Sequence, residues 1–192
     1  MCNFLSALIT KNGDVLWHAN LDSHSDLIVY HKLRDDDRFR NNFAKVELTP
    51  GGNPSDPTTW KWTIDEPTRP EWLDEVEDTA RKKLVAIAQG MIVTNGHHPL
   101  IADGCWIIGG DATVDRVING RIALVSGSAK IDSVSGSAKI DSVSGSAKIG
   151  SVYESAKIGS VYDSAKIDYV SGSAKIDNDL RAISKAAEIT TT

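Results

Sequence analysis

The chain has 192 residues, of which 41% are hydrophobic and 24% are charged, and its formal net charge at pH 7 is −5. These values are typical of a folded soluble protein with one large domain or two small ones. No apolar run reaches the ~18 residues of a membrane-spanning helix, and the first residues lack the features of a secretion signal. Two cysteines, Cys2 and Cys105, are too few for a disulfide framework and favour a cytoplasmic location.

Residues 1–110 predict an α+β domain. Alternating residues indicate strands at 4–10, 15–17, 45–48, 60–64, 91–93 and 105–108. The Asn12-Gly13 pair predicts a hairpin turn after the first of them. Residues 27–33 fit a short helix capped by Ser25-Asp26, and residues 27–30 fit a strand equally well. An apolar stripe predicts the clearest helix over 71–89, which Gly90 ends.

A nine-residue repeat begins at Ser128 and reads Ser-Ala-Lys-Ile-Asp-Ser-Val-Ser-Gly. Degenerate copies reach back to Asp111, which gives eight units over residues 111–176. Nine residues are about two and a half helical turns, so a helix would place successive isoleucines on opposite sides. Ile and Val with Ser and Gly favour short strands and turns instead. The repeat therefore predicts a β-solenoid.

Two units per coil are expected, because nine residues are too few to enclose a core. Eight units then make about four coils; a triangular coil of three units is the alternative. Two units per coil stack the lysines in two columns, one of Lys130, Lys148 and Lys166 and one of Lys139, Lys157 and Lys175. Glu154 replaces a turn glycine, which predicts that this corner does not require a positive φ. Residues 177–192 are expected to form a capping helix from Asp177 to Ile189 and a tail.

The solenoid is nearly neutral, with 8 basic and 7 acidic residues in 111–176. This balance excludes a basic track for nucleic acid. The repeat also lacks the Gly-Gly-x-Gly-x-Asp turns of calcium-binding β-rolls, and its apolar residues supply an interior without metal. We therefore expect neither a cofactor nor a structural metal.

Cys2 is the candidate catalytic residue. After removal of Met1, its thiol and α-amine would form a nucleophile–base pair. The Met1-Cys2 start resembles that of N-terminal-nucleophile glutamine amidotransferases, although the Gly-rich and Arg-containing motifs of that family are missing. A cysteine buried in the first strand is the alternative interpretation.

Candidate metal ligands are His18, His24 and His31, with Asp22 and Asp26 close in sequence. None of the histidines has a recognised ligand spacing, so solvated or capping histidines are the alternative. The His97-His98 pair, between Asn95-Gly96 and Pro99, is expected in an exposed loop.

Candidate partner contacts are aromatic residues and one lysine column: Trp60, Trp62, Tyr153, Tyr162, Lys130, Lys148 and Lys166. Trp60 and Trp62 are two residues apart and would share one face of a strand. Two tryptophans on the inner face of a sheet would instead be core residues.

The segment Val125-Ser126-Gly127-Ser128-Ala129-Lys130-Ile131 resembles the Val-x-Gly-Ser-Ala-x-Ile repeats of uncharacterised phage and bacterial proteins with a short N-terminal domain. The resemblance implies a β-rod and transfers no catalytic residue. We expect a non-enzymatic interaction module with a protein partner, a phage-encoded modulator or inhibitor of a host bacterial protein in the host cytoplasm. The solenoid would be a rigid spacer or an oligomerisation rod, for example in a homodimer. The alternative is a small hydrolase or amidotransferase that uses Cys2.

Overall fold

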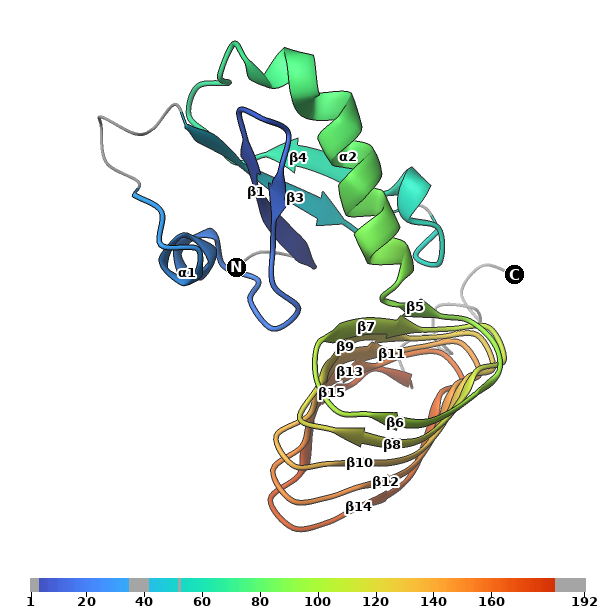
Figure 1. Ribbon diagram of the computed structural model, residues 1–192. Helices are drawn as coiled ribbons and strands as arrows, with labels where there is room; N and C mark the ends of the chain where they lie inside the picture. Colours follow the sequence, from blue (N-terminus) through green and yellow to red (C-terminus); the bar gives the residue numbers. More distant parts are fainter. Residues whose placement is uncertain (1–3, 35–41, 52, 182–192) are drawn as a thin grey trace. The chain divides into compact units, whose positions relative to one another are not determined.

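The computed structural model describes residues 4–34, 42–51 and 53–181 (Figure 1). The chain divides into two compact units, Met1–Met91 and Ile92–Thr192. The repeat placed the boundary at Asp111, but the second unit begins at Ile92 because three strands before the repeat already pair with the solenoid strands.

The first unit contains a four-stranded antiparallel sheet in the order β2-β1-β3-β4. Its strands are β1 (Leu5–Thr10), β2 (Val15–Leu16), β3 (Phe43–Thr49) and β4 (Lys61–Ile64). The expected turn between the first two strands is confirmed, and Gly13 has the positive φ of +77° that favours glycine there. A short 3-10 helix, η1 (Pro57–Thr59), precedes β4.

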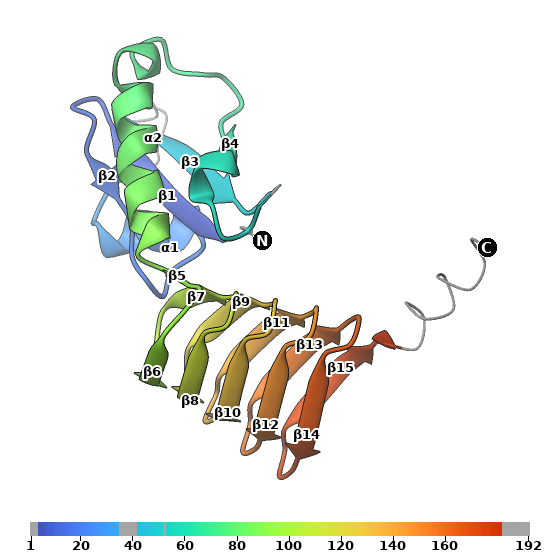
Figure 2. The same ribbon diagram turned by 90° about the vertical axis from the view of Figure 1, so that its right-hand side faces the viewer.

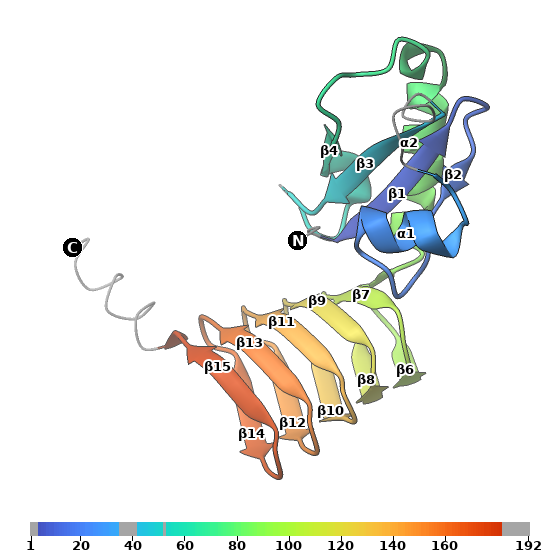
Figure 3. The ribbon, with the colours of Figure 1, turned by 90° about the vertical axis from the view of Figure 1, so that its left-hand side faces the viewer.

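Two helices cover the two faces of this sheet, as Figure 3 shows. Helix α1 (His24–Tyr30) packs Leu27 and Ile28 against Leu8 and Phe43. Residues 27–33 therefore belong partly to a helix, not to a strand. The helix begins earlier than expected because the Ser23 side chain, and not Ser25-Asp26, caps it.

Helix α2 (Leu73–Gln89) covers the other face of the sheet and ends at Gly90, as predicted. The side chains of Leu73, Ala80 and Leu84 are fully buried. They recur at helical spacing along one stripe, which is why the sequence pattern identified this helix.

The second unit is a β-solenoid built from two parallel sheets (Figure 2). One sheet contains β6 (His97–Ile101), β8 (Thr113–Ile118), β10 (Lys130–Ser135), β12 (Lys148–Val152) and β14 (Lys166–Val170). The other contains β5 (Ile92–Val93), β7 (Cys105–Ile108), β9 (Arg121–Val125), β11 (Lys139–Val143), β13 (Lys157–Val161) and β15 (Lys175–Asp179). Successive strands alternate between the sheets, so each coil holds two nonapeptides, as expected. The described strands make about five coils, one more than the repeat predicted, because β5, β6 and β7 precede it.

Identical residues stack along the solenoid axis. Ile131 pairs with Ile149, and Val134 pairs with Val152, one coil later in the same sheet. The repeated Ala, Ile and Val side chains fill the interior, and from Ala112 to Val161 they are at most 1% exposed. This continuous apolar core exists only when coils stack, as in other repeat proteins.

The solenoid corners keep a positive φ even where glycine is replaced. Glu154 has φ +61° and Asp163 has φ +54°, so the prediction that Glu154 relaxes this requirement is wrong. Both carboxylates compensate by accepting a backbone N–H from the preceding coil. Glu154 Oε2 lies 2.5 Å from the Gly136 nitrogen, and Asp163 Oδ2 lies 2.9 Å from the Gly145 nitrogen.

The last described strand, β15, occupies residues at which the C-terminal capping helix was expected to begin. Asp177 lies in β15, so a helix does not begin there, and the Leu180 N–H continues the pairing by donating to the Val161 carbonyl. The remainder of the expected helix, from residue 182, lies outside the described residues.

Candidate functional site

His24 is the most buried of the predicted ligand candidates, with 6% of its surface exposed. It is the first residue of α1 and follows the Ser23 cap. The segment before the helix is tied to β1, because Ser6 Oγ donates to the Asp22 carbonyl at 2.8 Å. These contacts hold the backbone just before His24 and thereby position its buried side chain.

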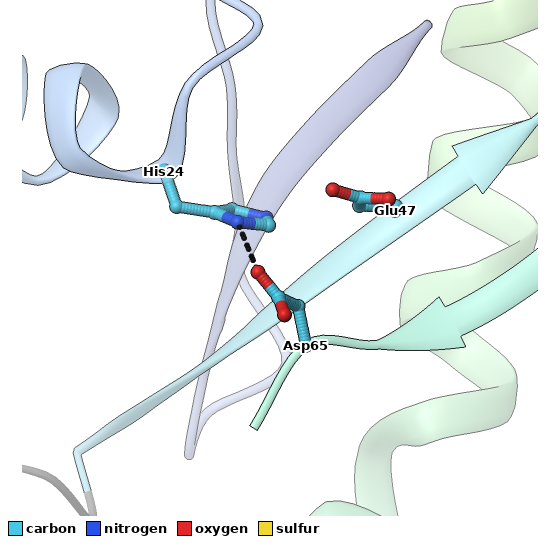
Figure 4. Close-up of side chains that lie close together, drawn as sticks. All are labelled: His24, Glu47 and Asp65. Carbon is cyan, nitrogen blue, oxygen red and sulfur yellow. Dashed lines mark hydrogen bonds and ion pairs between the residues drawn. The ribbon is translucent and has the colours of Figure 1, made fainter. Parts of the chain in front are cut away.

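Both ring nitrogens of His24 face oxygen atoms, and Figure 4 shows the one that faces Asp65. Nε2 lies 3.0 Å from the Val46 carbonyl, and Nδ1 lies 3.1 Å from Asp65 Oδ2. A carbonyl only accepts, so Nε2 carries a proton and donates it. Nδ1 then faces the carboxylate either with a second proton or with a lone pair.

The strand register brings two carboxylates to this ring. Glu47 on β3 pairs with Thr63 on β4, and the Asp65 N–H donates to the Lys45 carbonyl at 2.9 Å. Residues two apart share a face of a sheet, so Glu47 and Asp65 lie on the same face. One ligand atom each from His24, Glu47 and Asp65 lies within 4.8 Å of the others, so these three residues could hold a metal ion.

The other predicted ligands do not join this group. The rings of His18 and His31 instead contact Tyr30, with centroids 4.5 Å and 5.0 Å from it. Asp22 and Asp26 do not belong to the group either. Cys2 lies outside the described residues.

The second histidine pair was placed in a loop by the sequence, but it lies in strand β6. The sequence did not indicate this strand, because Asn95-Gly96 before the histidine pair and Pro99 after it are typical of a loop. His97 is exposed, and its Nε2 lies 2.7 Å from Asp115 Oδ1 on the adjacent strand β8.

The tryptophans predicted as partner contacts face inward. Trp60 is 1% exposed and meets Phe4 edge to face at 4.8 Å. Trp62 is half-buried, and its Nε1 donates to Glu77 Oε1 at 2.7 Å. The hydrogen bonds from Arg69 hold the pKa of Glu77 below its ordinary value, against the opposing effect of burial.

Two large apolar side chains are exposed instead, side by side on α1. Val29 is 76% exposed and Tyr30 is 55% exposed. The sequence did not indicate that Val29 and Tyr30 are exposed, because a run of four apolar residues at 27–30 suggests that all four are buried. In a helix, such a run must turn some of its side chains toward solvent.

The predicted lysine columns are present on the solenoid. Lys130, Lys148 and Lys166 pair in sequence along one sheet, and Lys139, Lys157 and Lys175 do so along the other. All six side chains are exposed, at strand spacings of about 4.8 Å. Of the two tyrosines predicted as partner contacts, Tyr162 is 36% exposed and Tyr153 is half-buried.

Comparisons of the chain with family models, with curated proteins and with solved structures found no match. In the described part of the chain, no helix has both the length and the apolar character needed to cross a membrane.

Proposed function

We propose that this protein is a non-enzymatic interaction module in which the N-terminal unit contacts a partner protein. The solenoid is a rigid spacer or an oligomerisation rod. The observation that carries this proposal is the adjacent exposure of Val29 and Tyr30 on α1. Exposed apolar side chains that lie together are typical of protein-binding surfaces, and tyrosine is enriched in them.

The surroundings of this surface support the proposal. The Tyr30 ring contacts the rings of both His18 and His31, with centroid distances of 4.5 Å and 5.0 Å, and these contacts restrict its motion before any partner binds. A rigid aromatic side chain loses little conformational entropy on binding. We infer a partner with a complementary apolar depression, ringed by polar groups that meet the two histidines.

The solenoid supports the spacer role. Its repeated Ala, Ile and Val side chains fill its own core from Ala112 to Ala165, and its outer faces carry the same lysine on every strand from β10 to β15. Tyr169 and Val170 on β14 are the exposed apolar exceptions near its described end. The resemblance of its repeat to phage proteins supports the partner class, a host bacterial protein that the module modulates or inhibits in the cytoplasm.

Affinity capture from a bacterial lysate, quantified by mass spectrometry, tests the proposal with two variants. The first carries Val29→Ser and Tyr30→Ser, and the second carries Lys130→Gln, Lys148→Gln and Lys166→Gln. All five residues are exposed, so both variants should fold. We expect a specific protein to be retained by the lysine variant and depleted at least about tenfold by the α1 variant.

Two results would overturn the proposal. If no protein is enriched over blank resin, the interaction role fails. If the lysine variant loses the partner while the α1 variant retains it, the solenoid is the recognition surface and the N-terminal unit is a cap.

A further inference from the structure

We propose that His24, Glu47 and Asp65 form a binding site for a divalent transition-metal ion of the zinc class. The inference does not depend on the proposed function, because it concerns the opposite end of α1 from the Val29–Tyr30 surface. It rests on the direction of the His24 nitrogens, the spacing of the ligand atoms and the local charge.

The His24 ring presents one of its nitrogens to a carboxylate. Its Nε2–H donates to the Val46 carbonyl at 3.0 Å, so Nδ1 is the ring nitrogen that faces Asp65 Oδ2, at 3.1 Å. This contact is favourable when either a proton or a metal ion lies between Nδ1 and the carboxylate. Histidine ligands in metal sites have this arrangement, with one nitrogen on the metal and the other donating to a backbone carbonyl.

The distance between His24 and Asp65 suits a shared zinc ion. Two ligand atoms that each lie about 2.1 Å from a zinc ion, at angles of roughly 90–110°, are themselves about 3.0–3.4 Å apart. His24 Nδ1 and Asp65 Oδ2 are 3.1 Å apart, which matches this spacing. The third ligand atom, from Glu47, lies within 4.8 Å of both.

The charge and the solvent access of the three residues also suit a divalent ion. A neutral imidazole and two carboxylates carry a net charge of −2, which a divalent ion neutralises. His24 is 6% exposed, whereas the Asp65 side chain is 61% exposed, so the site is anchored on one side and open to solvent on the other. Three protein ligands leave coordination positions for water, and the imidazole selects zinc-like ions over magnesium and calcium.

Titration calorimetry of the chelator-treated full chain with zinc chloride tests the site. We expect one site per chain that Glu47→Gln and Asp65→Asn each weaken by at least about tenfold. Both substitutions keep the side-chain shape and remove the charge, and neither removes the buried ring. The matched control is His97→Gln, which removes the exposed His97–Asp115 pair on the second unit.

A second readout identifies the ligating atom. In the zinc-loaded protein, the ¹⁵N chemical shift of His24 Nδ1 should indicate metal ligation while Nε2 keeps its proton. The proposal is overturned if zinc does not bind, or if magnesium binds as well as zinc. It is also overturned if His97→Gln abolishes binding while Glu47→Gln and Asp65→Asn retain it, which would leave an adventitious ion only.

Discussion

Two substitutions at Glu154 separate two energetic contributions to a solenoid corner. Glu154 has a φ of +61°, and its Oε2 accepts the Gly136 N–H of the preceding coil at 2.5 Å. Glu154→Ala keeps the positive φ and removes the hydrogen bond. Glu154→Gly removes the same hydrogen bond but also removes the steric cost of a Cβ at that φ.

The expected magnitudes follow from these two contacts. A hydrogen bond at an exposed corner contributes about 1 kcal/mol, even with a charged acceptor, because water competes for both groups. The left-handed conformation costs a non-glycine residue about 1 kcal/mol. Glu154→Ala should therefore destabilise the solenoid by about 1 kcal/mol, and Glu154→Gly should leave the free energy of unfolding nearly unchanged.

Urea unfolding, followed by hydrogen exchange of solenoid peptides, isolates this unit from the N-terminal one. The matched position is Asp163, with a φ of +54° and a contact of 2.9 Å to the Gly145 nitrogen, where the same pair of results is expected. Equal destabilisation by alanine and glycine would refute the cost assigned to the positive φ. An unchanged alanine variant would refute the contribution of the hydrogen bond.

Three further predictions concern the cores and one ion pair. Ile149→Ala, at a fully buried position, should cost about 2–5 kcal/mol in urea unfolding, and Ile176→Ala, in the less buried last strand, clearly less. Glu77→Gln should destabilise the N-terminal unit by roughly 1 kcal/mol at pH 7. Arg69 lowers the pKa of Glu77, so the stability difference between the wild type and Glu77→Gln should be complete above pH 4.5, the ordinary pKa of the group. The difference should disappear as the pH falls through the lowered pKa of Glu77. A stability difference that does not change with pH would contradict this prediction. Chelation with EDTA should leave the solenoid's melting temperature unchanged, since its interior is Ala, Ile and Val; a large drop would show a structural metal.

The sequence predicted the solenoid because one pattern determines both its local and its stacked structure. A nine-residue period would place successive isoleucines on opposite sides of a helix, which favours strands. Two units per coil were expected over three, and this choice correctly pairs Ile131 with Ile149. The strand at His97–Ile101 was missed because its residues depart from that pattern. It forms because β8 offers it a parallel edge, and local propensity does not show such an edge.

The candidate metal site was only partly predictable. His24 was identified, but Asp65 is 41 positions away and reaches it through the pairing of β3 with β4. The available signal was the alternation around Glu47, an acidic residue on the outward face of a predicted strand. Joining Glu47 to Asp65 requires the hairpin register, which depends on the conformation of the long loop between the two strands.

The central claim is that two nonapeptides complete one coil, and electron paramagnetic resonance of paired nitroxide labels tests it directly. In a background without native cysteines, labels at Lys130→Cys and Lys148→Cys should lie on adjacent strands about 5 Å apart and broaden the spectrum strongly. Labels at Lys130→Cys and Lys139→Cys should lie on opposite sheets, which are about 10 Å apart. Because both labels point away from the core, the distance between them is larger still, and the spectrum should broaden little. Strong broadening for Lys130→Cys with Lys157→Cys, and none for Lys130→Cys with Lys148→Cys, would contradict the claim and indicate three units per coil.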